Sequence, residues 1–165
     1  MTQDDAMCVK AASAELAYNR GPNKSGCLGS YPTPVENVTF VGNTVLTSCG
    51  GAKFGMQAEA PMRAVSFVDH VVVHARRGVV VEATEGTATM EDLLFQNVHI
   101  ETVTGTVSET GAEFPPEPIA ISTKFAPVRN VTLDNVAFAV AAKAMDGVSK
   151  VEGFWTVADV EDVRF

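Results

Sequence analysis

The 165-residue sequence predicts an all-β protein built as a parallel β-helix, a solenoid of about five coils. Three observations predict this fold class. A short apolar repeat recurs along the chain, a second set of apolar segments lies between its copies, and no stretch keeps a 3.6-residue period beyond a turn or two at 11–17. A β-sandwich, the competing fold, is expected to have Asn-Gly or Asp-Gly hairpin turns between segments of alternating apolar and polar residues, and the sequence has none in such places.

The first set of predicted strands has apolar residues at its first, fourth and, in all copies but the last, sixth positions. The copies begin 27, 28, 38 and 23 residues apart, at Val35, Met62, Met90, Val128 and Val151. The longest gap contains 106–117, which is rich in Gly, Pro and Glu and is predicted to be an inserted surface loop. The apolar column is expected to point inward through Val38, Phe40, Val65, Phe67, Leu93, Phe95, Val131 and Leu133.

The second set of predicted strands comprises Met7–Lys10, Lys53–Met56, Val79–Glu82 and Pro118–Ser122. Placing Cys8, Phe54 and Val80 in register stacks the first three strands, with 18–34 as a second inserted loop. Asn or Asp residues that tolerate a left-handed backbone are expected at bends between strands, at Asn43, Asp69, Asn97 and Asn135.

Composition narrows the function classes. One domain is expected at this length, with no membrane-spanning run and no visible signal peptide. The net charge of −8 argues against nucleic-acid binding. No cofactor or metal is expected, because the three cysteines match no zinc spacing. The cysteines are interpreted as buried thiols, with a Cys27–Cys49 bridge or a reactive thiol as alternatives, and the histidines (His70, His74 and His99) as structural or surface residues.

The predicted register brings polar residues together on one ledge. Asp4-Asp5 aligns with Gly50-Gly51 on the next strand and with Arg76-Arg77 on the one after, and Lys10 and Lys53 lie on neighbouring strands. Two adjacent carboxylates tend to separate into a proton donor and an ionised base, which is the chemistry of glycoside hydrolysis. A solvated acidic pair near a terminus is the alternative. The Asn-Val-Thr sequons at Asn37 and Asn130 are interpreted as ordinary repeat residues.

The segments Asp4-Asp-Ala-Met-Cys-Val-Lys10, Gly50-Gly-Ala-Lys-Phe-Gly-Met56 and the Val-x-Asn-Val-Thr coils resemble the polygalacturonase-like glycoside hydrolases of family 28 and its relatives. The resemblance implies a right-handed parallel β-helix of about five coils, secretion, and a polysaccharide substrate. It also implies inverting hydrolysis with Asp4 and Asp5 as the catalytic pair, without saying which is the acid. Lys10, Lys53, Arg76 and Arg77 are the expected substrate-binding residues.

Three departures from that family's pattern are visible. No third aspartate precedes the pair, no histidine stands at Cys49-Gly50-Gly51, and Val80-Val81-Glu82 replaces a basic pair that binds uronate. We therefore expect a neutral or differently charged polysaccharide, and a chain that corresponds to the C-terminal part of a longer enzyme. The alternatives are a non-catalytic carbohydrate-binding or structural β-helix, and a pectate-lyase-like enzyme with calcium on Asp4, Asp5 and Glu82. Self-association is expected through the N-terminal coil.

Overall fold

The computed structural model describes residues 4–11, 33–103, 106–107, 113–140, 150–153 and 160–165. These residues form strands without a helix, so the all-β prediction is confirmed for them. None of these residues forms a helix that could cross a membrane. The strands are β1 (Met7–Ala11), β2 (Val35–Val41), β3 (Thr44–Leu46), β4 (Gly50–Ala58), β5 (Met62–His74), β6 (Arg77–Glu85), β7 (Met90–Val103), β8 (Thr106–Val107), β9 (Glu113–Phe114), β10 (Glu117–Thr123), β11 (Val128–Val140), β12 (Lys150–Gly153) and β13 (Val160–Arg164).

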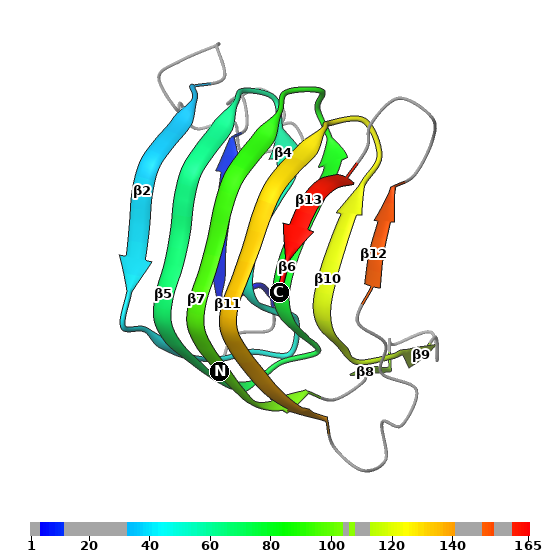
Figure 1. Cartoon of the computed structure of the whole chain (residues 1–165). Coiled ribbons are helices and arrows are strands. Elements are labelled where there is room, and N and C mark those ends of the chain that lie inside the picture. The colour runs from blue at the N-terminus through cyan, green and yellow to red at the C-terminus, as the bar shows by residue number, and fades with distance from the viewer. Residues whose placement is uncertain (1–3, 12–32, 104–105, 108–112, 141–149, 154–159) are drawn as a thin grey trace, which may run out of the picture.

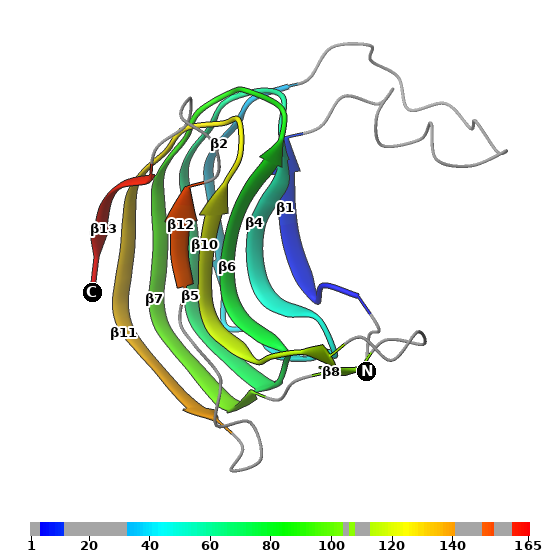
Figure 2. The same cartoon turned by 90° about the vertical axis from the view of Figure 1, so that its right-hand side faces the viewer.

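Two sheets of parallel strands make up the fold (Figure 1). One has the order β1-β4-β6-β10-β12, and the other the order β13-β11-β7-β5-β2, with β3 also pairing with β5. The strands alternate between the two sheets along the chain, and Figure 2 shows the sheets facing each other. Apart from β2 and β3, which both lie in the six-stranded sheet, and the antiparallel pair of β8 and β9, successive described strands therefore lie in opposite sheets.

The register of the six-stranded sheet confirms the first four predicted repeats. Val35 pairs with Met62, Met62 with Met90, and Met90 with Val128. The fifth repeat, predicted at Val151, is wrong. Val151 pairs with Ile121 in the other sheet, and the fifth strand of the column starts at Val160, opposite Val128.

The five-stranded sheet confirms the second predicted set of strands, with one correction of register. Cys8 pairs with Lys53, and Lys53 pairs with Val80, so Phe54 lies one residue beyond its predicted place. The reason is packing, because Phe54 is fully buried between the sheets, where its ring lies 4.8 Å from that of Phe67 and 4.9 Å from that of Phe95. Lys53 then lies on the opposite, outward face of its strand.

The core lies between the sheets and is built by the predicted apolar column. Six of the eight residues expected inside are buried, and Val38 and Phe40 pack against the core while partly exposed. Stacked rings of Phe40, Phe67 and Phe95 run across three neighbouring strands, with centroids 5.0 and 5.7 Å apart. The partial exposure of Val38 and Phe40 follows from their place on β2, the last strand of its sheet in the described chain.

Left-handed backbone recurs at two positions of the repeat. The third residue of each copy has positive φ at Asn37, Ala64, Asp92, Asn130 and Asp162, and the eighth at Gly42, Asp69, Asn97 and Asn135. The predicted bends at Asp69, Asn97 and Asn135 are thus confirmed, whereas Gly42 takes the place predicted for Asn43. Amide groups link the bends, since Asn97 Nδ2 donates to Asp69 Oδ1 and Asn135 Nδ2 donates to Asn97 Oδ1, both at 2.8 Å.

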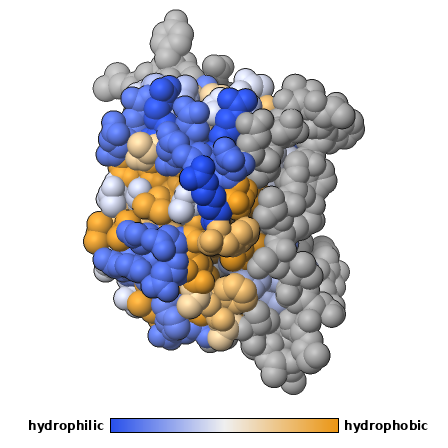
Figure 3. Space-filling view, in the orientation of Figure 1, coloured by the Kyte–Doolittle hydropathy of each residue, from blue (hydrophilic) through white to orange (hydrophobic). Residues whose placement is uncertain are grey.

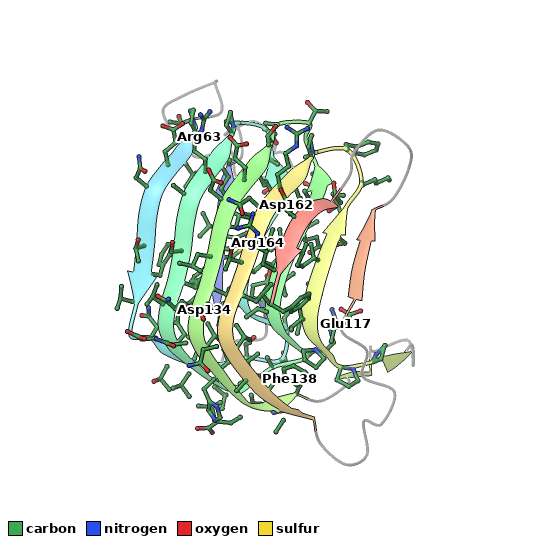
Figure 4. All side chains as sticks on the ribbon, in the orientation of Figure 1. Arg63, Glu117, Asp134, Phe138, Asp162 and Arg164 are labelled. Carbon is green, nitrogen blue, oxygen red and sulfur yellow. The ribbon has the colours of Figure 1, made fainter. Side chains whose placement is uncertain are left out.

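A row of alternating charges, which the sequence analysis missed, crosses the six-stranded sheet. In register, the second residue of each repeat is Glu36, Arg63, Glu91, Arg129 and Glu161. Arg63 Nε lies 2.9 Å from Glu36 Oε1. Figure 3 shows a hydrophilic band over the starting ends of these strands, where Figure 4 labels Arg63. Opposite charges on neighbouring strands favour this register over shifted ones.

Both predicted loops fall partly or largely outside the described residues. Of 106–117, the structure describes an antiparallel pair, β8 with β9, and the start of β10. The 18–34 loop, apart from its last two residues, and the helical turn considered at 11–17, apart from Ala11 in β1, lie outside the description, as does Cys27.

Candidate functional site

The predicted ledge lies where three strands of the five-stranded sheet begin. Asp5 precedes β1, Gly50 opens β4 and Arg77 opens β6. Gly50 pairs with Arg77, and Ala6 N donates to Gly50 O at 2.9 Å. The acidic pair and the arginines thus lie at neighbouring strand starts as predicted, but β4 is shifted by one residue, the same shift as at Phe54: Asp5 lies opposite Gly50 instead of Gly51, and Gly50 pairs with Arg77 instead of Arg76.

The Asp5 carboxylate is held by two donors on β4. Gly50 N donates to Asp5 Oδ1 at 2.9 Å, and Lys53 Nζ lies 3.0 Å from Asp5 Oδ2. A Cβ at position 50 would lie only 2.5 Å from Asp5 Oδ1, so a larger residue there would displace this carboxylate. Both carboxylate oxygens are thus satisfied by donors that favour the ionised form.

Glu82, on β6, completes the site and was not predicted as one of its catalytic or substrate-binding residues. Glu82 Oε2 lies 2.8 Å from Lys53 Nζ and 3.3 Å from Arg77 Nη1. Negative and positive side chains therefore alternate in the order Asp5, Lys53, Glu82 and Arg77, from the residues just before β1 across β4 to β6. We call these four residues the charge relay. One signal in the sequence pointed to Glu82: in the predicted register it is the acidic residue nearest to Lys53 on the next strand.

Burial differs along the charge relay and decides what its members can do. The Lys53 side chain is 3% exposed, whereas those of Asp5, Arg77 and Glu82 are 11%, 13% and 19% exposed. Lys53, expected to bind substrate, instead lies beneath two carboxylates. It can fix the position and charge of Asp5 but does not itself present a free ammonium group.

The pKa shifts follow from this arrangement. Burial, the largest single effect, raises the pKa of Asp5 and of Glu82, but the lowering by Lys53, joined by Cys49 and Gly50 N at Asp5 and by Arg77 at Glu82, outweighs it, so each carboxyl has a pKa below its ordinary value. Burial alone lowers the pKa of Lys53, and the hydrogen bond and charge of Glu82, with the charge of Asp5, raise it above 10.5. At neutral pH all three groups are charged.

Asp4 and Arg76 lie beside the charge relay. Asp4 is exposed, its Oδ1 accepts the Asp5 N–H at 2.7 Å, and its carbonyl oxygen accepts the Thr47 hydroxyl. Arg76 Nη1 lies 3.6 Å from Oε2 of Glu117, the first residue of β10, which Figure 4 labels. Lys10 is exposed on the same face of β1 as Cys8. The sheet thus gathers the predicted catalytic pair with Lys53, Arg76 and Arg77, and leaves Lys10 further along its strand.

The side chains around Asp4 and Asp5 are poorly suited to binding a metal ion. Asp4, Asp5 and Cys49 have one potential ligand atom each within 4.8 Å of one another. However, Asp5 is already paired with Lys53, and Arg77 Nη2 points to Cys49 Sγ at 3.9 Å. Glu82, the third calcium ligand considered from the sequence, is held by two cations. These donors do not fit the oxygen shell that calcium requires.

The cysteines that the structure describes do not match the interpretation as buried thiols, because Cys8 is exposed and Cys49 is half-buried, and both are free. The Cys8 thiol donates to Gly55 O at 2.9 Å, and burial raises its pKa to about 11, so Cys8 is not a thiolate nucleophile at neutral pH. His70, which is buried, accepts a hydrogen bond at Nδ1 from Asn43 N (3.0 Å), and its Nε2 lies 3.0 Å from Phe40 O. The structural interpretation of His70 is therefore confirmed.

Comparisons of the chain with family models, curated proteins and solved structures found no match.

Proposed function

We propose that the two sheets are the faces of a right-handed parallel β-helix, each coil giving one strand to each sheet. The alternation of β1, β2, β4, β5, β6, β7, β10, β11, β12 and β13 between two parallel sheets supports this architecture. So do the register of the first four repeats and the positive φ values at the same two positions of the repeat. Right-handed crossover between parallel strands is the general rule for such connections.

We propose further that the protein is a glycoside hydrolase that cleaves a polysaccharide with Asp4 and Asp5. One observation carries this proposal: a carboxylate held ionised by Gly50 N and Lys53 lies directly beside an exposed carboxyl group. Hydrolysis of a glycosidic bond needs an ionised base for water and a proton donor for the leaving oxygen. The environments of the two residues differ in the sense that this division requires.

The geometry assigns a role to each aspartate. Asp5, with its lowered pKa, is the base that removes a proton from the attacking water. Asp4, the exposed carboxyl group of the pair, donates the proton to the leaving oxygen. The two carboxyl groups offer oxygens within 4.8 Å of each other, which is closer than the separation of about 6.5–9.5 Å typical of inverting glycosidases. Lys53 acts as a positioning residue, and Arg76 and Arg77 line the approach for the polymer.

A panel of neutral and acidic polysaccharides tests this proposal through the release of reducing ends. Asp4→Asn and Asp5→Asn each remove one proton-transfer partner with little change of shape, so each should lower the rate by about 10² to 10⁴. Asp134→Asn is the matched control, because Asp134 is an exposed aspartate on the other sheet, hydrogen-bonded to Gln96. Full activity in both site variants would overturn the assignment.

A second candidate, a non-catalytic carbohydrate-binding β-helix, is favoured by the pairing of the cations. Lys53, Arg76 and Arg77 each contact a carboxylate of the protein itself. Retention on immobilised polysaccharide without release of reducing ends, unaffected by Asp5→Asn, would support this candidate. Release of unsaturated products would instead indicate a lyase.

A further inference from the structure

Two identical Asn-Val-Thr tripeptides occupy the same position of the repeat. Asn37 lies on β2 and Asn130 on β11, and both have left-handed backbone, with φ of 55° and 48°. Asn-x-Thr is the acceptor sequence for N-linked glycans. Because the local sequence and backbone match, any difference between the two sites comes from their neighbours in the sheet.

Asn130 lies within the sheet, with a strand on each side. Strand β11 pairs with β7 and with β13, and Asn130 Nδ2 donates to Asp92 Oδ1 on β7 at 2.6 Å. The nitrogen that would carry a glycan is thus committed to the neighbouring strand. A sugar on this nitrogen would have to fit between the bends of two adjacent strands, about 4.8 Å away on either side.

Asn37 has different surroundings. Strand β2 is the last of its sheet in the described part of the chain, and the corresponding residue on β5 is Ala64, which has no polar side chain. Asn37 and Thr39 are both exposed, and no described residue is hydrogen-bonded to the Asn37 side chain. Among the described residues, the Asn37 amide therefore has no strand on its outer side, whereas Asn130 has one on each side.

We propose that Asn37 is an N-glycosylation site and that its glycan covers the exposed edge of β2. A lipid-linked oligosaccharide is the donor. Asn37 Nδ2 forms a bond to C1 of the first sugar and loses a proton, while the bond from C1 to the lipid pyrophosphate breaks. A bulky hydrophilic group on an edge strand prevents another strand from pairing with it. This inference does not depend on the proposed hydrolysis.

Secretion of the full chain from a eukaryotic host, behind a cleavable signal, tests the site. Wild type, Asn37→Gln and Asn130→Gln are treated with an N-glycosidase and weighed by mass spectrometry. Wild type and Asn130→Gln should each lose the mass of one glycan, and Asn37→Gln should lose none. Glycan transfer precedes export, so the same comparison on cell extracts covers a variant that is retained in the cell.

An unmodified Asn37 in wild type, or a glycan carried at Asn130 by folded, secreted protein, would overturn the site assignment. The covering role has a separate readout. Wild type examined by size-exclusion chromatography should gain larger species after glycan removal, and Asn37→Gln should contain them from the start. An unchanged elution volume in both cases would overturn the covering role and leave the site itself standing.

Discussion

Lys53 is a buried charged residue whose cost of burial is offset by ion pairs with two carboxylates. Its ammonium group contacts two carboxylates, at 3.0 Å and 2.8 Å, and Arg77 contacts one of them from the other side. Removing one member of a buried ion pair is costly because the remaining charge stays buried without its partner. The sequence shows that Asp5, Lys53 and Glu82 carry charges, but it does not show that the Lys53 side chain is buried.

Replacing Lys53 by methionine keeps the length of the side chain and removes the charge. Asp5 and Glu82 then lose a shared partner, so we expect the free energy of unfolding to fall by on the order of 2 kcal/mol, less than for fully buried pairs because both carboxylates keep some contact with solvent. Urea unfolding measures this. Lys10→Met is the matched control on an exposed lysine, expected within about 0.5 kcal/mol of wild type. Equal free energies of unfolding for Lys53→Met and Lys10→Met would contradict the stabilising role of the charge relay.

The same contacts predict how stability depends on pH. Asp5 and Glu82 have folded pKa values below their ordinary 3.8 and 4.5, so they stabilise the protein above those values and cease to do so as the pH falls through the folded ones. Lys53 has a folded pKa above 10.5, so its contribution is complete below 10.5 and is lost as the pH rises further. Thermal unfolding of wild type and Lys53→Met should therefore differ between about pH 5 and pH 10 and converge at acid pH. A constant difference down to pH 2 would contradict this.

At the scale of the element, the sequence predicted four of the five strands in the repeat column and misplaced the fifth. Strands β2, β5, β7 and β11 start at the predicted residues. The fifth was sought at Val151, although Val160-Glu-Asp-Val-Arg-Phe165 carries the full pattern of apolar first, fourth and sixth residues. A regular period favoured the nearer segment, whereas the sheet accepts connections of different lengths because only the strands must stay in register.

Strands β1 and β2 are the edge elements on the same side of the two sheets. An edge strand leaves one row of backbone groups without a partner strand, which favours fraying or association between copies. In a monomer, amide hydrogen exchange should be faster at 7–11 than in the paired strands β4 and β6. Concentration-dependent protection of β1 would show association. Protection of β1 equal to that of β6 in a strictly monomeric sample would contradict the prediction.

At the scale of the whole molecule, the site exists only because the chain crosses repeatedly between two sheets. Asp5, Lys53 and Glu82 are separated by 48 and 29 residues along the chain, yet the pairing of β1 with β4 and of β4 with β6 brings their side chains into contact. The repeat predicted that the acidic pair, the Gly50-Gly51 segment and the arginines lie on neighbouring strands, with β4 one residue out of register. It missed the role of Glu82, because side-chain reach between strands does not follow from spacing alone.

The central claim is that this stacking holds Asp5 as an ionised carboxylate against Lys53. Carbon-detected NMR titration of the Asp5 carboxyl group in the intact protein measures it most directly. We predict an inflection below 3.8 in wild type that moves upward in Lys53→Met, with no change in Lys10→Met. An Asp5 inflection at or above 3.8 in wild type, or one that Lys53→Met leaves in place, would contradict the account.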